Sequence, residues 1–237
     1  MTSGHSVAIT TGLCFAAAYL VGSIPFGYLI TRRELRRDLR RFDRSRRGLS
    51  LLVGRGADPA RLPRGVDVAG AVLDTAKVVA VVLSVGTIVR HAGPSVHRAD
   101  VQSFSAVGFV SDQALFYWES AALWAGLVAV VGHLYSVWLG FRSGQGQLPA
   151  LGLAVLCTPF GFSVAALGFF IGLIVTRVVR PAIVFALGGF VVYGWVAWVY
   201  DFGWSWGFRN GPELALWSAV LAGVVGTRLP AQPAAQR

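Results

Sequence analysis

Apolar residues in this chain gather in long blocks separated by polar segments, instead of alternating with polar ones at the two-residue period of strands. Most of these blocks are long enough for a helix that crosses a bilayer core of roughly 30 Å. They cover residues 7–30, 66–89, 121–141, 148–175, 183–200 and 214–225. The pattern predicts an all-α, polytopic integral membrane helix bundle with six or seven transmembrane helices.

The fourth block, residues 148–175, is too long for one upright helix. Pro159 and Gly161 lie near its middle, where they favour a break. We therefore expect two short or re-entrant helices that go out and return. The first block, residues 7–30, continues well beyond Ala18 and ends in arginines, so we interpret it as a retained helix and not as a cleaved signal peptide.

Composition supports the membrane class, because 55% of residues are hydrophobic, 14% are charged and the mean hydropathy is +0.62. The net charge of +10 is concentrated: twelve of the 21 basic residues lie between Arg32 and Arg64. Such a segment directly after a membrane helix is typical of a cytoplasmic loop that faces anionic lipid. We therefore expect membrane lipid as a partner and no nucleic acid.

The position of the arginines also predicts the topology. The N-terminus lies outside, residues 31–65 form a cytoplasmic arginine-rich loop, residues 90–119 an external loop and residues 228–237 a cytoplasmic tail. Residues 1–237 form a single membrane domain, which we place as a multi-pass protein in a plasma membrane of the bacterial inner-membrane type. Aromatic residues mark the far interface: Trp195, Trp198, Tyr200, Trp204 and Trp206.

Few residues inside the apolar blocks carry chemistry. Asp74 and Lys77 are three apart on one helical face, so they form either a mutual ion pair or a contact to a substrate. Cys14 and Cys157 lie in apolar blocks and provide neither a disulfide framework nor a metal site. We predict no metal and no cofactor.

Residues 132–152, GHLYSVWLGFRSGQGQLPALG, form a glycine-punctuated segment between two apolar blocks. Lipid cannot satisfy the free backbone N–H groups of such a loop, so it must line an aqueous or anion-filled pocket at the membrane edge. A backbone nest beside a helix end is a natural cradle for phosphate.

These residues resemble the PlsY family, integral membrane acyltransferases that transfer an acyl group from acyl phosphate to glycerol 3-phosphate in phospholipid biosynthesis. AYLVGSIPFGYLI at residues 18–30 is similar to the family's first helix, and Asp74 with Lys77 to its D-x-x-K signature. Residues 132–152 resemble its GH-x-FP-x-x-LGFKGGKG-x-AT loop. A proline in mid-helix and the TR dipeptide at residues 176–177 follow in the family's order.

The resemblance implies two substrates, acyl phosphate and glycerol 3-phosphate, and a set of site residues. Ser45 and His133 become catalytic candidates, with His133 either binding a substrate, acting as a base or serving only a structural role. The substrate-binding candidates are Arg55, Lys77, Arg142, Ser143, Gly144, Gln145 and Gly146.

The chain departs from the family pattern in three places. In the first motif, GSGN-x-GATN-x-x-R, only the spacing of Ser45 and Arg55 remains. In the second, Gln145 replaces a lysine, which removes a cation. The third, a His and an Asn at H-x-x-N, has no counterpart in WSAVLAGVVGTRLP. We therefore expect a weakened acyltransferase or a catalytically silent relative that serves as a membrane or lipid-binding subunit with a protein partner. A small-solute transporter is disfavoured because no inverted repeat is visible.

The topology predicts which side of the membrane each loop faces. Cysteines placed singly at Ser50 and Ser105 should differ in their reaction with an impermeant thiol reagent on intact cells: Ser105→Cys should be labelled and Ser50→Cys protected until the cells are opened. Labelling of Ser50→Cys from outside, with Ser105→Cys protected, would reverse the orientation.

Overall fold

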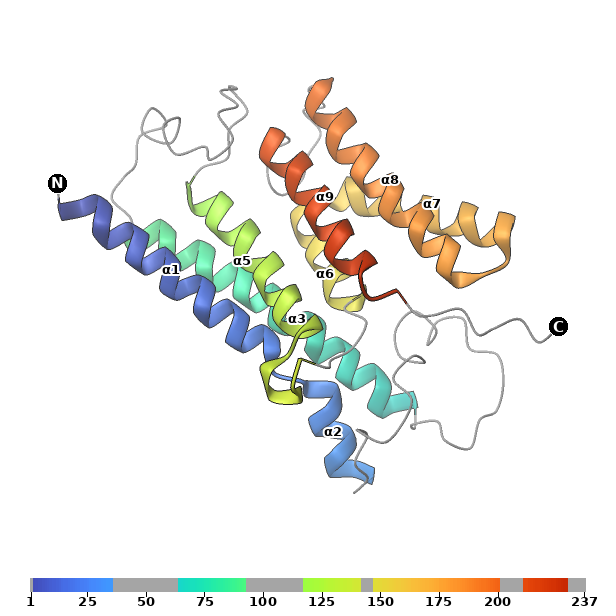
Figure 1. The fold of residues 1–237 in the computed structure, drawn as a ribbon, viewed down its shortest axis with the longest axis horizontal. Coiled ribbons are helices and arrows are strands. Elements are labelled where there is room, and N and C mark those ends of the chain that lie inside the picture. Colours follow the sequence, from blue (N-terminus) through green and yellow to red (C-terminus); the bar gives the residue numbers. More distant parts are fainter. Residues whose placement is uncertain (1, 36–63, 93–116, 142–146, 201–210, 230–237) are drawn as a thin grey trace.

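The computed structural model describes residues 2–35, 64–92, 117–141, 147–200 and 211–229. Within these ranges the chain is helical and contains no strand, which confirms the predicted all-α class (Figure 1). The elements are α1 (Thr2–Ser23), α2 (Phe26–Leu35), α3 (Arg64–Ala92), α5 (Tyr117–Leu134), the 3-10 helix η5 (Val137–Leu139), α6 (Gln147–Cys157), α7 (Pro159–Thr176), α8 (Val179–Val199) and α9 (Pro212–Gly226).

The length and apolarity of these helices suit a membrane. Five segments of the described chain qualify for a full crossing, and α6 and α9 are shorter apolar helices. Side chains of α7 such as Leu167, Phe170 and Ile174 are largely exposed. Water would penalise such a surface, whereas lipid solvates it. The integral membrane fold predicted from the sequence is therefore confirmed.

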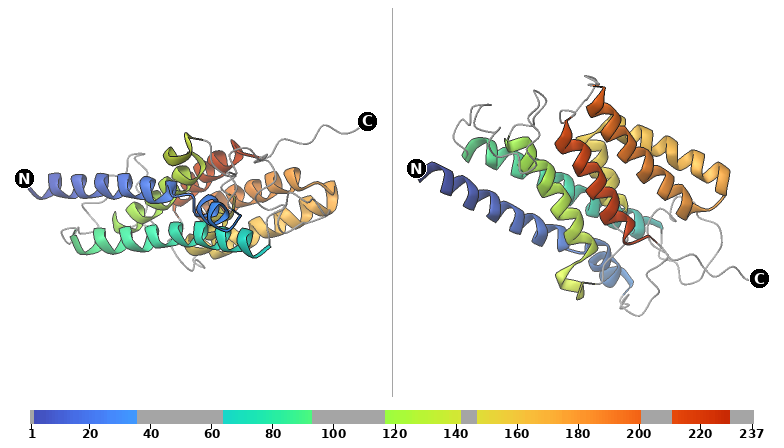
Figure 2. Two further views of the ribbon diagram at one scale, coloured as in Figure 1. Left: turned by 90° about the horizontal axis from the view of Figure 1, so that it is seen from below. Right: turned by 45° about the horizontal axis from the view of Figure 1, so that its top comes forward.

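The helices form two groups. Figures 1 and 2 show α1, α3 and α5 side by side in one group and the α7–α8 pair in the other. α6 packs on α3 and on α7, and α9 packs on α8 and contacts α5. Trp217 of α9 is fully buried and donates its Nε1–H to the carbonyl of Leu123 in α5 at 3.1 Å. Glu213 of α9 accepts hydrogen bonds from Ser120 and, at 2.7 Å, from Trp124.

The expectation of one continuous helix over residues 7–30 is wrong. α1 ends at Ser23, and α2 begins at Phe26 after a break at Ile24 and Pro25. Pro25 has no N–H and restricts the conformation of the residue before it, so the regular bonding of the helix is interrupted here. The break frees backbone carbonyls for side-chain donors.

The fifth helix is also shorter than the apolar block from residue 121 to residue 141 suggested. α5 ends at Leu134 and is followed by η5 and a tight turn. Gly140 and Phe141 both have positive φ angles, 60° and 58°, and the Phe141 N–H bonds the Ser136 carbonyl at 2.8 Å. This turn folds the chain back before residue 142.

The long block at residues 148–175 divides as predicted. α6 ends at Cys157 and α7 begins at Pro159, which occupies the first turn of the helix, where its missing N–H costs nothing. α7 is long enough to cross the membrane by itself. The second piece is therefore longer than the short helix expected from the sequence.

Glycines allow α1 and α5 to approach closely. A Cβ on Gly22 would lie 2.2 Å from the carbonyl oxygen of Ala129, and a Cβ on Gly132 would lie 2.4 Å from that of Tyr19. Both distances are far below van der Waals contact. Small residues at such positions are the usual means of packing helices in membranes, where lipid removes the hydrophobic driving force between helices.

This packing predicts a selective loss of stability. Gly22→Ala should force α1 and α5 apart and lower the thermal unfolding temperature, with overpacking costs of about 1–3 kcal/mol. Gly12→Ala is the matched control in the same helix, because a Cβ there meets nothing within 4 Å. Thermal unfolding in detergent checks this, and equal melting temperatures for the two variants would contradict the close packing.

Candidate functional site

A buried ion pair lies in the middle of α3. Lys77 Nζ is 2.8 Å from Asp74 Oδ1, and the two residues are only 6% and 9% exposed. Their three-residue spacing places them on one helical face, so the ion pair predicted from the sequence is confirmed. Charged groups inside a membrane bundle are costly and therefore need partners.

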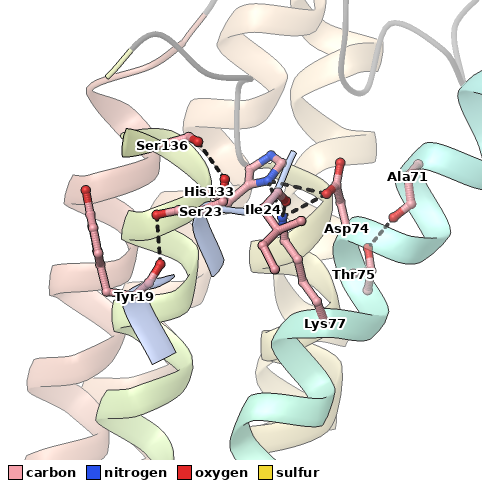
Figure 3. Close-up of polar contacts among 9 residues, drawn as sticks. All are labelled: Tyr19, Ser23, Ile24, Ala71, Asp74, Thr75, Lys77, His133 and Ser136. Atoms are coloured by element: carbon pink, nitrogen blue, oxygen red, sulfur yellow. Dashed lines mark hydrogen bonds and ion pairs between the residues drawn. The ribbon is translucent and has the colours of Figure 1, made fainter. Parts of the chain in front are cut away.

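The ion pair is completed by two other elements (Figure 3). His133, near the end of α5, places Nδ1 3.2 Å from Lys77 Nζ and 3.8 Å from Asp74 Oδ1. Lys77 also donates to the carbonyl of Ile24, which the break between α1 and α2 leaves available. Lys77 thus joins α3 to α5 and to the break.

α2 approaches the same cluster through glycines. A Cβ on Gly27 would lie 3.3 Å from Asp74 Oδ2, and one on Gly70 would lie 2.8 Å from the Gly27 Cα. The carboxylate therefore faces backbone, with little room for a larger side chain. This close approach gives the ion pair fixed surroundings.

A chain of hydrogen bonds ties the end of α1 to the segment after α5. Ser136 Oγ donates to the Ser23 carbonyl at 2.5 Å, and Ser23 Oγ donates to the Tyr19 carbonyl at 2.8 Å. The Tyr19 hydroxyl donates to the Tyr135 carbonyl at 2.8 Å. These bonds hold the last turn of α5 against the break on the other side of His133.

The C-terminal end of α9 meets the same segment. The Tyr135 hydroxyl lies 3.0 Å from Thr227 Oγ1, and the Arg228 guanidinium lies over the Tyr135 ring at 4.4 Å. Arg228 also donates to the Phe141 carbonyl at 3.3 Å. The carbonyl that receives this bond belongs to the last residue before the loop at 142–146.

The structure brings two of the sequence-predicted site residues together, His133 and Lys77. The remaining ones, Ser45, Arg55 and residues 142–146, lie outside the described residues. The flanks of that loop are described: Phe141 is exposed, and Gln147, the first residue of α6, is 4% exposed. The described parts of the chain contain no group of three or more His, Cys, Asp or Glu side chains that could hold a metal ion.

Sequence reasoning missed the contact between His133 and Lys77 and the contribution of α9. Both join residues far apart in sequence, 56 and 87 positions in the bonds named above. The S-I-P tripeptide at residues 23–25 was the available signal for the break, because a proline in mid-helix frees carbonyls. Arg228 was interpreted only as part of a basic tail.

Comparison with known sequences identifies relatives of this chain. The profile of a family described as "Glycerol-3-phosphate acyltransferase" matches residues 12–229. A glycerol-3-phosphate acyltransferase of Anaeromyxobacter sp. (strain Fw109-5) is 29% identical over 187 residues, 77% of this chain and 78% of the relative. Another, of Cereibacter sphaeroides (strain ATCC 17025 / ATH 2.4.3), is 36% identical over 162 residues, 68% of this chain and 60% of the relative.

Comparison with solved structures supports the same fold. The crystal structure of PlsY (YgiH), an integral membrane glycerol 3-phosphate acyltransferase, in its glycerol 3-phosphate form has a TM-score of 0.56 at 20% identity, covering 92% of this chain and 87% of that one. Its lysphosphatidic acid form gives 0.58 with the same coverage. With the family profile covering most of its length and its fold shared with a solved member, this chain belongs to the glycerol-3-phosphate acyltransferase family of integral membrane proteins.

Proposed function

We propose that this protein transfers an acyl group from acyl phosphate to glycerol 3-phosphate at the cytoplasmic face of a bacterial-type plasma membrane, and that it does so slowly. The observation that carries the proposal is the convergence of His133, the Asp74–Lys77 pair and the turn at Phe141 directly before the loop at residues 142–146. Family membership supports the substrate class, and membrane lipid surrounds the site.

The reaction requires positioning more than covalent chemistry. The glycerol hydroxyl attacks the acyl carbon, an ester C–O bond forms, the bond from that carbon to the phosphate oxygen breaks, and the hydroxyl proton leaves with the phosphate. Acyl phosphate is already activated, so the protein has to hold two phosphates and neutralise their charge. Arg55 and Arg142 suit this task because guanidinium pairs with phosphate through two parallel hydrogen bonds.

The other candidates take complementary roles in this proposal. Ser45, Ser143 and the backbone around Gly144 and Gly146 supply neutral hydrogen bonds to phosphate oxygens. Lys77 was predicted as a substrate-binding residue, but its hydrogens are directed at Asp74, His133 and the Ile24 carbonyl. This arrangement favours a supporting role for Lys77 behind the site.

A catalytically silent relative that acts as a membrane subunit is the second candidate. The observation in its favour is the loss of the family's His and Asn from the C-terminal motif together with the lysine replaced by Gln145. Purified protein assayed with acyl phosphate and glycerol 3-phosphate distinguishes the two. Measurable transfer supports the enzyme, and a stoichiometric protein partner without transfer supports the subunit.

Restoring the missing cation should raise the rate. Charge-assisted hydrogen bonds are roughly twice as strong as neutral ones, and one transition-state donor contributes about 2.7–4 kcal/mol, on the order of a hundred- to a thousandfold. We expect Gln145→Lys to increase acyl transfer and Gln145→Glu, of matched size, to abolish it. Robust turnover by the unmodified protein, unchanged in Gln145→Lys, would contradict the proposed weakening.

The glycines of the loop should matter for anion binding. Gly144→Ala and Gly146→Ala place a Cβ in the proposed phosphate cradle and disfavour positive φ angles there, so both should weaken glycerol 3-phosphate binding. Gly223→Ala in α9 is a control, because a Cβ there meets nothing within 4 Å. Isothermal titration of the detergent-solubilised protein checks this, and parental affinity in both loop variants would reduce the loop to a simple turn.

A further inference from the structure

The contacts of Lys77 determine which nitrogen of His133 can carry a proton. The ammonium group has three hydrogens and no lone pair. Its three acceptors are Asp74 Oδ1 at 2.8 Å, the Ile24 carbonyl and His133 Nδ1 at 3.2 Å. A nitrogen so close to an ammonium interacts favourably only through its own lone pair.

Nδ1 of His133 is therefore the acceptor of the ring, and the proton of the neutral imidazole sits on Nε2. The other tautomer would direct an N–H at the ammonium. Asp74 Oδ1, at 3.8 Å from Nδ1, is too far away to accept that hydrogen instead. In Figure 3 the ring lies beside Lys77 with one nitrogen directed at it and the other turned away.

We propose that Lys77 locks His133 in the Nε2–H tautomer, so that His133 acts on the substrate as a hydrogen-bond donor to an anionic oxygen and not as a general base. This inference rests on the proposed function for the identity of the substrate. A base needs an accessible lone pair, and the lone pair that this ring offers is directed at Lys77. A phosphate oxygen and the oxyanion formed at the acyl carbon are both acceptors for the Nε2–H.

The two amide side chains separate the possible roles of His133. Glutamine places its NH₂ close to the position of Nε2, whereas the shorter asparagine reaches only as far as Nδ1, and neither is a base. We expect His133→Gln to keep acyl transfer within about tenfold of the parent and His133→Asn to lose on the order of a hundredfold or more. His91→Gln, at an exposed position near the end of α3, is the control and should match the parent.

Thermal unfolding of all variants must accompany this comparison, so that a loss of folding is not mistaken for a loss of chemistry. Equal, near-complete loss in folded His133→Gln and His133→Asn would overturn the donor role and favour a base. Glycerol 3-phosphate binding is measured on the same variants. If the parent neither binds glycerol 3-phosphate nor transfers an acyl group, the proposed function and the donor role fail together.

The tautomer is tested independently of any substrate. Nitrogen NMR of protein labelled at its four histidines distinguishes protonated from unprotonated ring nitrogens, and the His133 signals are those missing from His133→Gln. We expect an unprotonated Nδ1 and a protonated Nε2. A protonated Nδ1, in either a neutral or a charged ring, would overturn the tautomer assignment whatever the enzymatic result.

Discussion

The structure depends on keeping one ammonium group inside a membrane bundle with each of its hydrogens accepted. Lys77 achieves this with acceptors from three places: its own helix, α5 and the break between α1 and α2. A regular helix engages its carbonyls in the bonds of the next turn, so the Ile24 carbonyl is available because Pro25 interrupts α1. The same break presents the Ser23 carbonyl to Ser136. The requirement of Lys77 therefore ties together a helix break, the end of α5 and the position of His133.

These bonds form only because the backbones lie unusually close. Side-chain donors such as Ser136 are short, so α1 must lie almost against α5, and Gly22 and Gly132 make this possible. α2 reaches Asp74 through the contact between Gly27 and Gly70. Small residues and buried polar groups act together here, since each close contact shortens the distance that a polar side chain must span. A larger residue at these positions would disturb the polar cluster as well as the packing.

The sequence was sufficient for those features that depend on local patterns. Apolar block lengths predicted the helices, Pro159 predicted the division between α6 and α7, and a three-residue spacing predicted the Asp74–Lys77 pair. It was insufficient for the contact of Lys77 with His133, because nothing in a local pattern specifies which helices pack together. The early end of α5 was missed because the apolar character continues through residues 137–139, and only the tertiary bonds of Ser136 and Phe141 distinguish the turn from more helix.

The departures of this chain from the family pattern change side chains without removing the elements that carry them. The end of α9 lacks the His and Asn of the third motif, yet Thr227 and Arg228 hold it against Tyr135 and Phe141. Arg228 is a cation, and it bonds the residue directly before the loop whose own lysine is replaced by Gln145. The turn that it contacts includes Phe141 in a left-handed conformation, which is costly for a side chain with a Cβ and persists only where surrounding contacts enforce it. The geometry ahead of the loop is thus actively maintained, and the expected loss of rate is a matter of missing charge and missing donors within an intact architecture.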